Sequence, residues 1–211
     1  MQVLIGCEYS GTVRDAFLEA GHDAWSNDIL DTESRPERHL KMDVIDALRS
    51  RHWDLAIIHI PCTAMGVCGN KHYGVGKPKH QERRDAIEWS LKVWDVAVEQ
   101  ADAVAMENPA SVLFPYLREM RGADVQYVQP WMFGHMEQKK TGFATRNLPR
   151  LTPTNDVYAE MMKLPKKERE RVFYMSPGPD RGKERARFYP GIAAAIPPAW
   201  AANSYNPRGR C

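Results

Sequence analysis

A cysteine and a glutamate stand at similar places in the chain, each at the end of an apolar run. Cys62 follows Pro61 and the run 55–60, and Glu107 ends the run 103–107. Such runs are typical of buried parallel strands, whose carboxyl ends meet at one ligand-binding edge of a sheet. An activated thiolate is a strong nucleophile, and a carboxylate serves as acid or base. The pair predicts a covalent site, although a lone cysteine is often only a small apolar side chain.

Short apolar runs alternate with helical patterns along the chain. This alternation predicts an α/β fold with a mostly parallel central sheet and helices on both faces. We expect strands at 3–6, 23–27, 39–42, 53–59, 103–106, 126–129 and 141–145. We expect helices at 13–20, 44–50, 81–100, 166–173 and 192–203, a loop at 176–187, and an interruption of the last helix at Pro197 and Pro198. We expect residues 1–150 to form a core and residues 151–211 a short basic extension that packs on it.

Composition narrows the class of protein. The 211 residues carry 29 Lys and Arg against 27 Asp and Glu, a net charge of +2. No apolar run reaches the ~18 residues of a membrane helix, and the strand-like start at residues 3–6 is unlike a signal peptide. We therefore expect a cytoplasmic protein with reduced thiols at Cys7, Cys62, Cys68 and Cys211. The Cys and His spacing matches no common zinc pattern, so no metal site is expected.

Basic residues concentrate in three segments, 71–84, 139–150 and 163–187. A local basic surface can hold phosphates even when the total charge is small. Segment 63–84, rich in Gly and Lys, is interpreted as a closing lid, with a merely solvated loop as the alternative. The candidate nucleic-acid contacts are Lys71, Lys77, Lys79, Arg83, Arg84, Lys139, Arg185 and Arg187.

A small-residue turn, residues 6–11, follows the first expected strand and opens a helix. Such a turn lets the backbone approach a ligand closely, although an ordinary tight turn is an equal reading of this segment. Asp28 stands at the end of the second strand, where dinucleotide folds keep an acid for ribose hydroxyls. Asp43 follows the third strand, and its alternative role is to cap the helix at 44–50.

The order of these motifs resembles that of the cytosine-C5 DNA methyltransferases, above all the short phage- and prophage-type members. The resemblance covers nearly the whole chain. Its most specific stretches are residues 6–11, 13–17, 59–63, 107–109, 133–141 and 189–193.

The resemblance implies a Rossmann-like, S-adenosylmethionine-dependent methyltransferase fold. It implies a turn around the amino acid part of that cofactor, an acid for the ribose and an acid for the adenine. The residues at these positions are Glu8, Tyr9, Ser10, Gly11, Asp28 and Asp43, with Pro61 beside them.

The resemblance also implies catalytic residues. Cys62 would be the nucleophile that attacks C6 of cytosine, and Glu107 the acid that grips the base. Asn108 would orient the neighbouring loop, and Lys140 stands where the family keeps an arginine. The family's second arginine of that segment is missing here, and Arg185 or Arg187 is expected to replace it.

The chain departs from the full-length family in its second half, because only about 60 residues follow Arg150. We therefore expect DNA with weak sequence preference, single-stranded DNA or a cytosine nucleotide as the partner. Two alternatives stay open. One is the same scaffold acting on another pyrimidine or transferring another group. The other is a non-catalytic protein that binds DNA or the cofactor.

Overall fold

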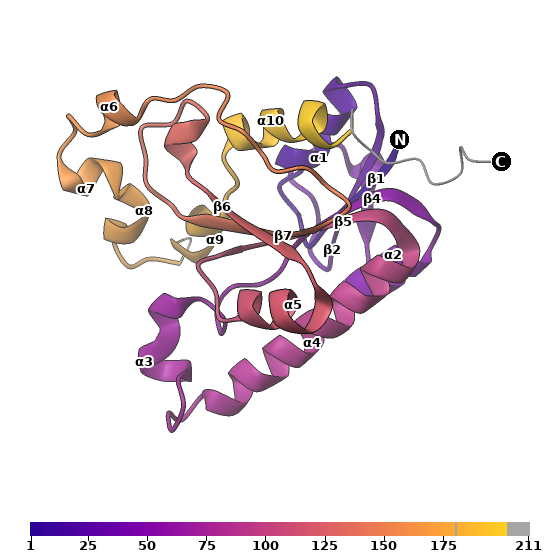
Figure 1. Ribbon diagram of the computed structural model, residues 1–211, viewed down its shortest axis with the longest axis horizontal. Coiled ribbons are helices and arrows are strands. Elements are labelled where there is room, and N and C mark those ends of the chain that lie inside the picture. The colour runs from indigo at the N-terminus through magenta and orange to yellow at the C-terminus, as the bar shows by residue number, and fades with distance from the viewer. Residues whose placement is uncertain (180, 202–211) are drawn as a thin grey trace.

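A seven-stranded sheet with helices on both faces forms the protein in the computed structural model, which describes residues 1–179 and 181–201 (Figure 1). The strands are β1 (Gln2–Gly6), β2 (Asp23–Asp28), β3 (His39–Lys41), β4 (Trp53–His59), β5 (Ala101–Pro109), β6 (Asp124–Val128) and β7 (Thr141–Arg146). Their order is β3-β2-β1-β4-β5-β7-β6, and β7 pairs antiparallel with both β5 and β6. The other pairs are parallel. The expected α/β class, with a mostly parallel central sheet and helices on both faces, is confirmed.

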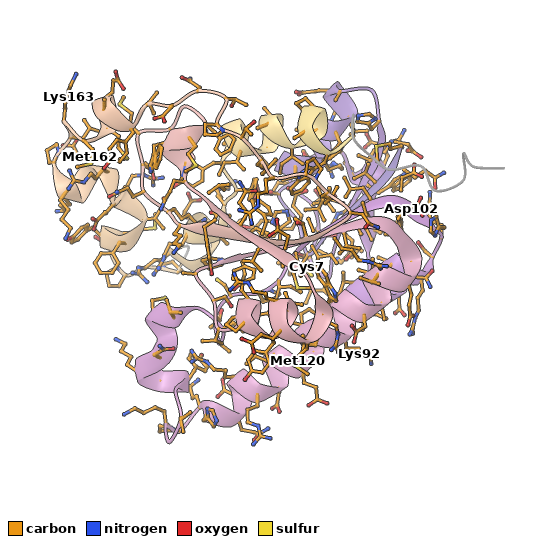
Figure 2. All side chains as sticks on the ribbon, viewed as in Figure 1. Cys7, Lys92, Asp102, Met120, Met162 and Lys163 are labelled. Atoms are coloured by element: carbon orange, nitrogen blue, oxygen red, sulfur yellow. The ribbon has the colours of Figure 1, made fainter. Side chains whose placement is uncertain are left out.

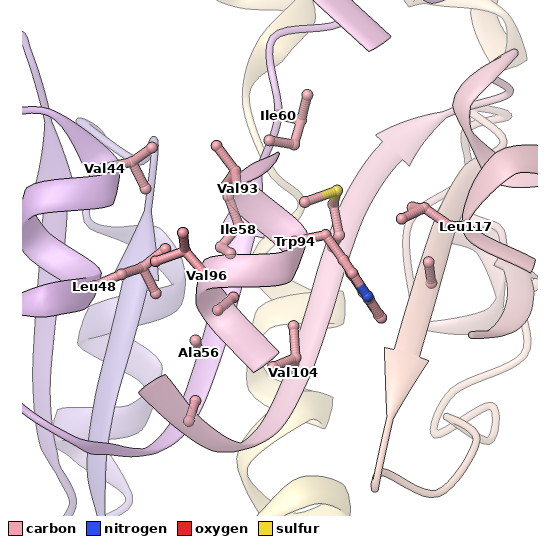
Figure 3. Close-up of a cluster of buried hydrophobic side chains, with 14 of the residues drawn as sticks. Val44, Leu48, Ala56, Ile58, Ile60, Val93, Trp94, Val96, Val104 and Leu117 are labelled. Carbon is pink, nitrogen blue, oxygen red and sulfur yellow. The ribbon is translucent and has the colours of Figure 1, made fainter. Parts of the chain in front are cut away.

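Helices follow most strands along the chain. They are α1 (Thr12–Glu19), α2 (Val44–Arg49), α3 (Asn70–Tyr73), α4 (His80–Gln100), α5 (Leu113–Arg121), α6 (Tyr158–Met161), α7 (Lys166–Arg169), α8 (Arg171–Tyr174), α9 (Arg181–Ala186) and α10 (Pro190–Trp200). Side chains of α2, α4 and α5 pack on one face of the sheet, and those of α1 and α10 pack on the other. Figure 3 shows the first cluster, with Leu48 of α2 and Trp94 of α4 over Ala56 and Val104 of the sheet.

The strands β1, β4 and β5 run in one direction and end at one edge of the sheet. Gly6 pairs with Ile58, and His59 pairs with Glu107. Because successive side chains of a strand point to opposite faces, Glu107 shares the face of Ala103 and Ala105, which is the face of α1 and α10. The loops that leave these strands are therefore neighbours in space.

The structure differs from the sequence-based expectations mainly after β5. Helix α5 was not expected, because Pro115 interrupts its pattern, but proline is tolerated in a first helical turn. The basic helix expected at 166–173 is two short helices that meet at Glu170. Helix α9 lies inside the segment expected to be a loop.

The interruption expected at Pro197 and Pro198 does not occur, because α10 continues through both residues. Ile192, Ile196 and Trp200 of this helix are completely buried in the core cluster with α1. Burial of each such side chain contributes about 2 kcal/mol, which offsets the hydrogen bonds that proline cannot make. Residues 202 and 203 of the expected helix, and Cys211, lie outside the described residues.

Arg14 of α1 is completely buried and ties β2 and the segment after it to the helix. Its guanidinium donates to Ser26 Oγ at 2.8 Å, Ser34 Oγ at 2.6 Å and Asp15 Oδ1 at 2.9 Å. A Cβ added at Gly11, whose φ is +75°, would collide with this guanidinium. The turn before α1 therefore requires glycine for both conformation and space.

We predict that Arg14→Met lowers the free energy of unfolding by about 3 kcal/mol or more, because it leaves buried oxygens without donors. Arg35→Met is the matched control, since Arg35 pairs with the same Asp15 at 3.4 Å from an exposed position. Exposed pairs contribute about 1 kcal/mol or less. Urea denaturation followed by circular dichroism measures both, and equal losses for the two variants would contradict the prediction.

Candidate active site

The carboxyl edge of β4 and β5 brings a thiol, a carboxylate and an imidazole together. Cys62 follows β4 by three residues, through the exposed Pro61. The side chains of His59 and Glu107 are 12% and 13% exposed, and His59 Nδ1 lies 3.3 Å from Glu107 Oε2. The structure thus brings Cys62 and Glu107 to one site, as expected, and adds His59 to it. Strand periodicity could have revealed His59, because it shares the face of Leu55 and Ile57.

Asn108 holds the loop from the opposite face of β5. It is completely buried, and its Nδ2 donates to the carbonyl of Ile60 at 2.7 Å. The carbonyl lies two residues before Cys62, so this hydrogen bond fixes where the loop leaves the sheet. Asn108 Oδ1 is buried and accepts no hydrogen bond from the described residues. The geometry gives Asn108 a positioning role for the Cys62 loop.

Arg83 fixes the other end of the same loop and is not on the surface. Its side chain reaches back from α4 to donate to the carbonyl of Ala64 at 2.7 Å and to Asn70 Oδ1 at 2.7 Å. The residue is 6% exposed. The structure therefore assigns Arg83 to holding the loop, in place of the expected contact to a nucleic-acid phosphate. Of the other cations expected there, Lys71, Lys77, Lys79 and Arg84 are exposed.

The thiol of Cys62 is exposed, and its surroundings raise its pKa. The residue is exposed, yet loss of hydration around the sulfur raises its pKa, and the nearby Glu107 carboxylate raises it further. The charge of Lys139 acts in the opposite direction. Burial and Glu107 therefore disfavour the thiolate, and Lys139 favours it.

Lys139, and not Lys140, is the lysine that acts on the thiol and the carboxylate. Burial lowers the pKa of Lys139, while Glu107 and Cys62 counteract that effect. Its Nζ donates to the carbonyl of Arg185 at 2.7 Å. Lys140 is exposed, and its Nζ lies 4.1 Å from the centre of the Tyr127 ring. Tyr127 packs on Phe114 of α5, so Lys140 lies over the other face of the sheet.

We predict that Lys139→Gln raises the pKa of the Cys62 thiol by about one unit, since an adjacent cation favours the thiolate. The pH dependence of iodoacetamide alkylation, read at Cys62 by peptide mass spectrometry, measures this without substrate. Lys140→Gln is the matched control and should leave the profile unchanged. An equal shift in both variants would remove Lys139 from the site.

The loop after β1 contains a carboxylate that serves the fold. Glu8 is 5% exposed, and its oxygens accept from the backbone N–H groups of Val13 at 2.7 Å and Arg14 at 3.3 Å. Burial raises the pKa of Glu8, and the charge of His59 and these hydrogen bonds lower it. Glu8 therefore satisfies the first turn of α1, and the structure does not leave it free for a ligand as the sequence suggested.

Two carboxylates and a cysteine gather at the ends of β1, β2 and β3. Burial raises the pKa of Cys7 to about 12, and the charges of Asp28 and Asp43 raise it as well. Figure 2 labels Cys7 near the middle of the view. Asp43 Oδ1 caps α2 by accepting from Ile45 N at 2.8 Å, so the capping alternative holds. Asp28 Oδ1 accepts from Leu30 N at 3.0 Å.

The second oxygens of Asp28 and Asp43 accept no hydrogen bond from the described residues. Ile29 and Leu30, directly after Asp28, are 72% and 55% exposed. The edge therefore offers two open carboxylate oxygens beside exposed apolar side chains. This donor and contact set suits the hydroxyl and amino groups of a nucleoside with its flat base.

The segment 181–189 lies across both halves of the edge. Arg187 Nη1 bonds Glu33 Oε2 at 3.0 Å, and Lys183 Nζ bonds Glu33 Oε1 at 2.8 Å. Lys183 also lies over the Tyr9 ring, 5.2 Å from its centre. Ser10 Oγ, in the same loop, bonds Glu8 Oε1 at 3.3 Å. Arg187 is thus committed to carboxylates.

Arg185 is the cation of this segment that stays open. Its guanidinium forms no hydrogen bond or ion pair with any described residue, and its charge lowers the pKa of Lys139. Of the two arginines expected to replace the missing one, Arg185 is therefore the one left available to a substrate.

Neither a metal cluster nor a membrane helix is found in the described ranges. No group of three or more His, Cys, Asp or Glu side chains there could hold a metal ion. No helix in residues 1–179 and 181–201 has the length and apolar character to cross a bilayer.

No protein-family model and no curated protein matches the sequence. Solved structures with detectable similarity include a candidate DNA modification methyltransferase from an E. coli prophage, at 14% identity and a TM-score of 0.49 over 74% of this chain and 52% of that one. The methyltransferase EhMeth of Entamoeba histolytica gives 12% and 0.48, over 74% and 57%. The bifunctional kinase-methyltransferase WbdD gives 10% and 0.43, over 71% and 38%. The chain spans about half the length of the prophage protein. Similarity at this level assigns no activity, which must come from the site residues.

Proposed function

We propose that the protein transfers a methyl group from S-adenosylmethionine to C5 of cytosine in DNA, through a covalent bond between Cys62 and C6 of the base. The observation that carries the proposal is the meeting of Cys62, Glu107 and Lys139 at one edge of the sheet. A nucleophile, an acid and a cation that favours the thiolate are the groups this chemistry needs.

Carbon 5 of cytosine is a poor nucleophile until a thiolate adds to C6. The Cys62 thiol first loses its proton to water. The sulfur then forms the bond to C6, the electron pair of the C5–C6 double bond moves toward C5, and N3 takes a proton from Glu107. S-adenosylmethionine, when bound, supplies the electrophilic methyl group. Water then removes the C5 proton, the double bond returns, the thiolate leaves and N3 gives its proton back to Glu107. Lys139 balances the negative charge on sulfur at the start and at the end.

The residues at the ends of β1, β2 and β3 fit S-adenosylmethionine. Asp28 would hold the ribose hydroxyls, Asp43 the adenine amino group, and Ile29 and Leu30 the flat base. The turn Tyr9, Ser10 and Gly11 would take the amino acid part. Glu8 would position this turn, because its oxygens already accept from the backbone of α1.

DNA is the proposed substrate because exposed cations surround the Cys62 loop. Lys71, Lys77, Lys79 and Arg84 lie on the loop and on the first turn of α4, and Arg185 lies near Lys139. Such cations position a backbone without reading its sequence. The base must be flipped from a duplex or offered on a single strand to reach the thiol.

A second candidate is the same chemistry on a free or single-stranded pyrimidine nucleotide, or with another transferred group. The observation that favours it is the short segment between β7 and α10, whose helices α6, α7 and α8 have 4 residues each and α9 has 6. A segment of this kind provides little surface for reading a duplex.

Intact mass spectrometry tests the proposal. The wild-type protein is incubated with S-adenosylmethionine and 5-fluorodeoxycytidine oligonucleotides, single- and double-stranded, and with 5-fluorodeoxycytidine monophosphate. Fluorine at C5 cannot leave as a proton does, so the adduct persists. An adduct with an oligonucleotide supports the proposal, whereas an adduct with the nucleotide alone supports the second candidate. No adduct, despite calorimetric binding of the cofactor, would overturn both and leave a non-catalytic role.

A further inference from the structure

His59 is the residue at the carboxyl edge that the proposed chemistry leaves without a role. It ends β4, its Nδ1 lies 3.3 Å from Glu107 Oε2, and the ring of Phe188 packs edge-on against it at 5.0 Å between centres. Its Nε2 is buried and has no hydrogen-bond partner among the described residues. A buried ring nitrogen without a hydrogen-bond partner destabilises the folded protein. A functional role for His59 would explain why such a group is present.

Titratable groups of three other segments surround the imidazole and its partner. Glu8, in the loop after β1, is buried and responds to the charge of His59. Cys62 and Lys139 both respond to the charge of Glu107. Phe188, before α10, covers the ring and adds no charge. His59 thus lies between two carboxylates, with its Nδ1 turned toward the one that is proposed to protonate the base.

We propose that His59 is a positioning residue that shares one proton with Glu107 and so holds the acid in place for proton transfer to the base. This inference rests on the proposed function. The proton lies either on Glu107 Oε2 with Nδ1 as acceptor, or on Nδ1 with the carboxylate as acceptor. When Cys62 adds to C6, the shared proton passes through Glu107 to N3. When the thiolate leaves, the proton returns from N3 to the pair, so the pair ends the cycle with the proton it began with, while the C5 proton leaves to water.

The buried Nε2, which has no partner among the described residues, favours this role over a purely structural one. His39, in contrast, uses both ring nitrogens, with Ser26 Oγ at 2.8 Å and the Leu30 carbonyl at 3.0 Å. In His59 the free nitrogen lets the ring change its proton count without breaking a second bond. Two groups that share a proton titrate as a pair, so replacement of His59 should change the pH dependence of the proton transfer.

The chain offers a matched control on the same two strands. His52, directly before β4, bonds Asp102 of β5 through Nε2 at 3.0 Å, at the opposite end of the sheet. The test therefore compares His59→Asn with His52→Asn. Asparagine can still donate an N–H to Glu107 but cannot hold the extra proton.

We expect His59→Asn to lower the rate of 5-fluorocytosine trapping about tenfold at pH 8 and to move the falling, basic limb of its pH profile about one unit lower. Cofactor binding by calorimetry should be unchanged, and His52→Asn should behave as wild type. A pH profile of unchanged shape in His59→Asn would overturn the proposal.

A second measurement needs no activity. The ¹⁵N shifts of the His59 ring report where its proton lies, and they should change in Glu107→Gln but not in Asp102→Asn. If these shifts depend on Glu107 while no substrate is trapped, the shared proton stands and the proposed function fails. If the shifts ignore Glu107, the shared proton is refuted whatever the activity. This NMR measurement also tests the shared proton if the His59→Asn variant does not fold.

Discussion

Cys62→Ala should abolish the covalent adduct and lower turnover by about 10⁴-fold or more, because loss of the nucleophile removes the step that activates C5. The residues that flank the sulfur cannot replace it. Pro61 and Thr63 flank it, and neither forms a stable bond to C6. The variant should keep its stability and its affinity for S-adenosylmethionine, since Cys62 is exposed and bonds no core group.

Cys68→Ala is the matched control for that experiment. Cys68 is a free, exposed thiol in the same loop, and its effect on the pKa of Cys62 is smaller than those of Glu107 and Lys139. We expect this variant to form the adduct at the wild-type rate. An adduct in Cys62→Ala that disappears only when Cys68 is also replaced would move the nucleophile to Cys68.

Glu107→Gln has the second-largest expected effect, a loss of about 10²- to 10⁴-fold in the rate of adduct formation. Glutamine fits the space and can accept from the base amino group, but it gives no proton to N3. It also removes the carboxylate charge that raises the pKa of Cys62 while the shared proton lies on His59. Iodoacetamide should therefore alkylate Cys62 faster in this variant, while trapping by 5-fluorodeoxycytidine becomes slower.

These opposite changes separate acid catalysis from damage to the site. Glu119→Gln, on the exposed surface of α5, is the control and should change neither rate. If alkylation and trapping both slow in Glu107→Gln, the variant has distorted the loop. If trapping is unaffected, Glu107 does not act on the base.

The sequence predicted the first half of the fold well because its elements follow local patterns. The strand expected at 53–59 has the bounds of β4, and the helix expected at 81–100 differs from α4 by one residue. The misses have tertiary causes. Helix α10 continues through Pro197 and Pro198 because one of its faces is buried against α1, and no local pattern reports that contact.

The site was predictable in part for the same reason. Cys62 and Glu107 follow recognisable strands, so their meeting could be inferred from topology. The choice between Lys139 and Lys140 depends on which face of β7 each residue continues, and a one-residue difference reverses the face. The roles of Glu8 and Arg83 could not be read from the sequence, because each depends on backbone groups that only the folded loops present.

The packing of α10 on α1 determines when the protein can complete its folding during translation. The two helices join segments near opposite ends of the described chain, a contact of very large sequence separation. A ribosome that has completed β1 to β5 has produced the sheet edge with Cys62 and Glu107, but the apolar face of α1 still faces water. Contacts of this kind slow folding, and the exposed surface invites aggregation until they close. The nascent chain should therefore depend on chaperones until α10 has left the ribosome.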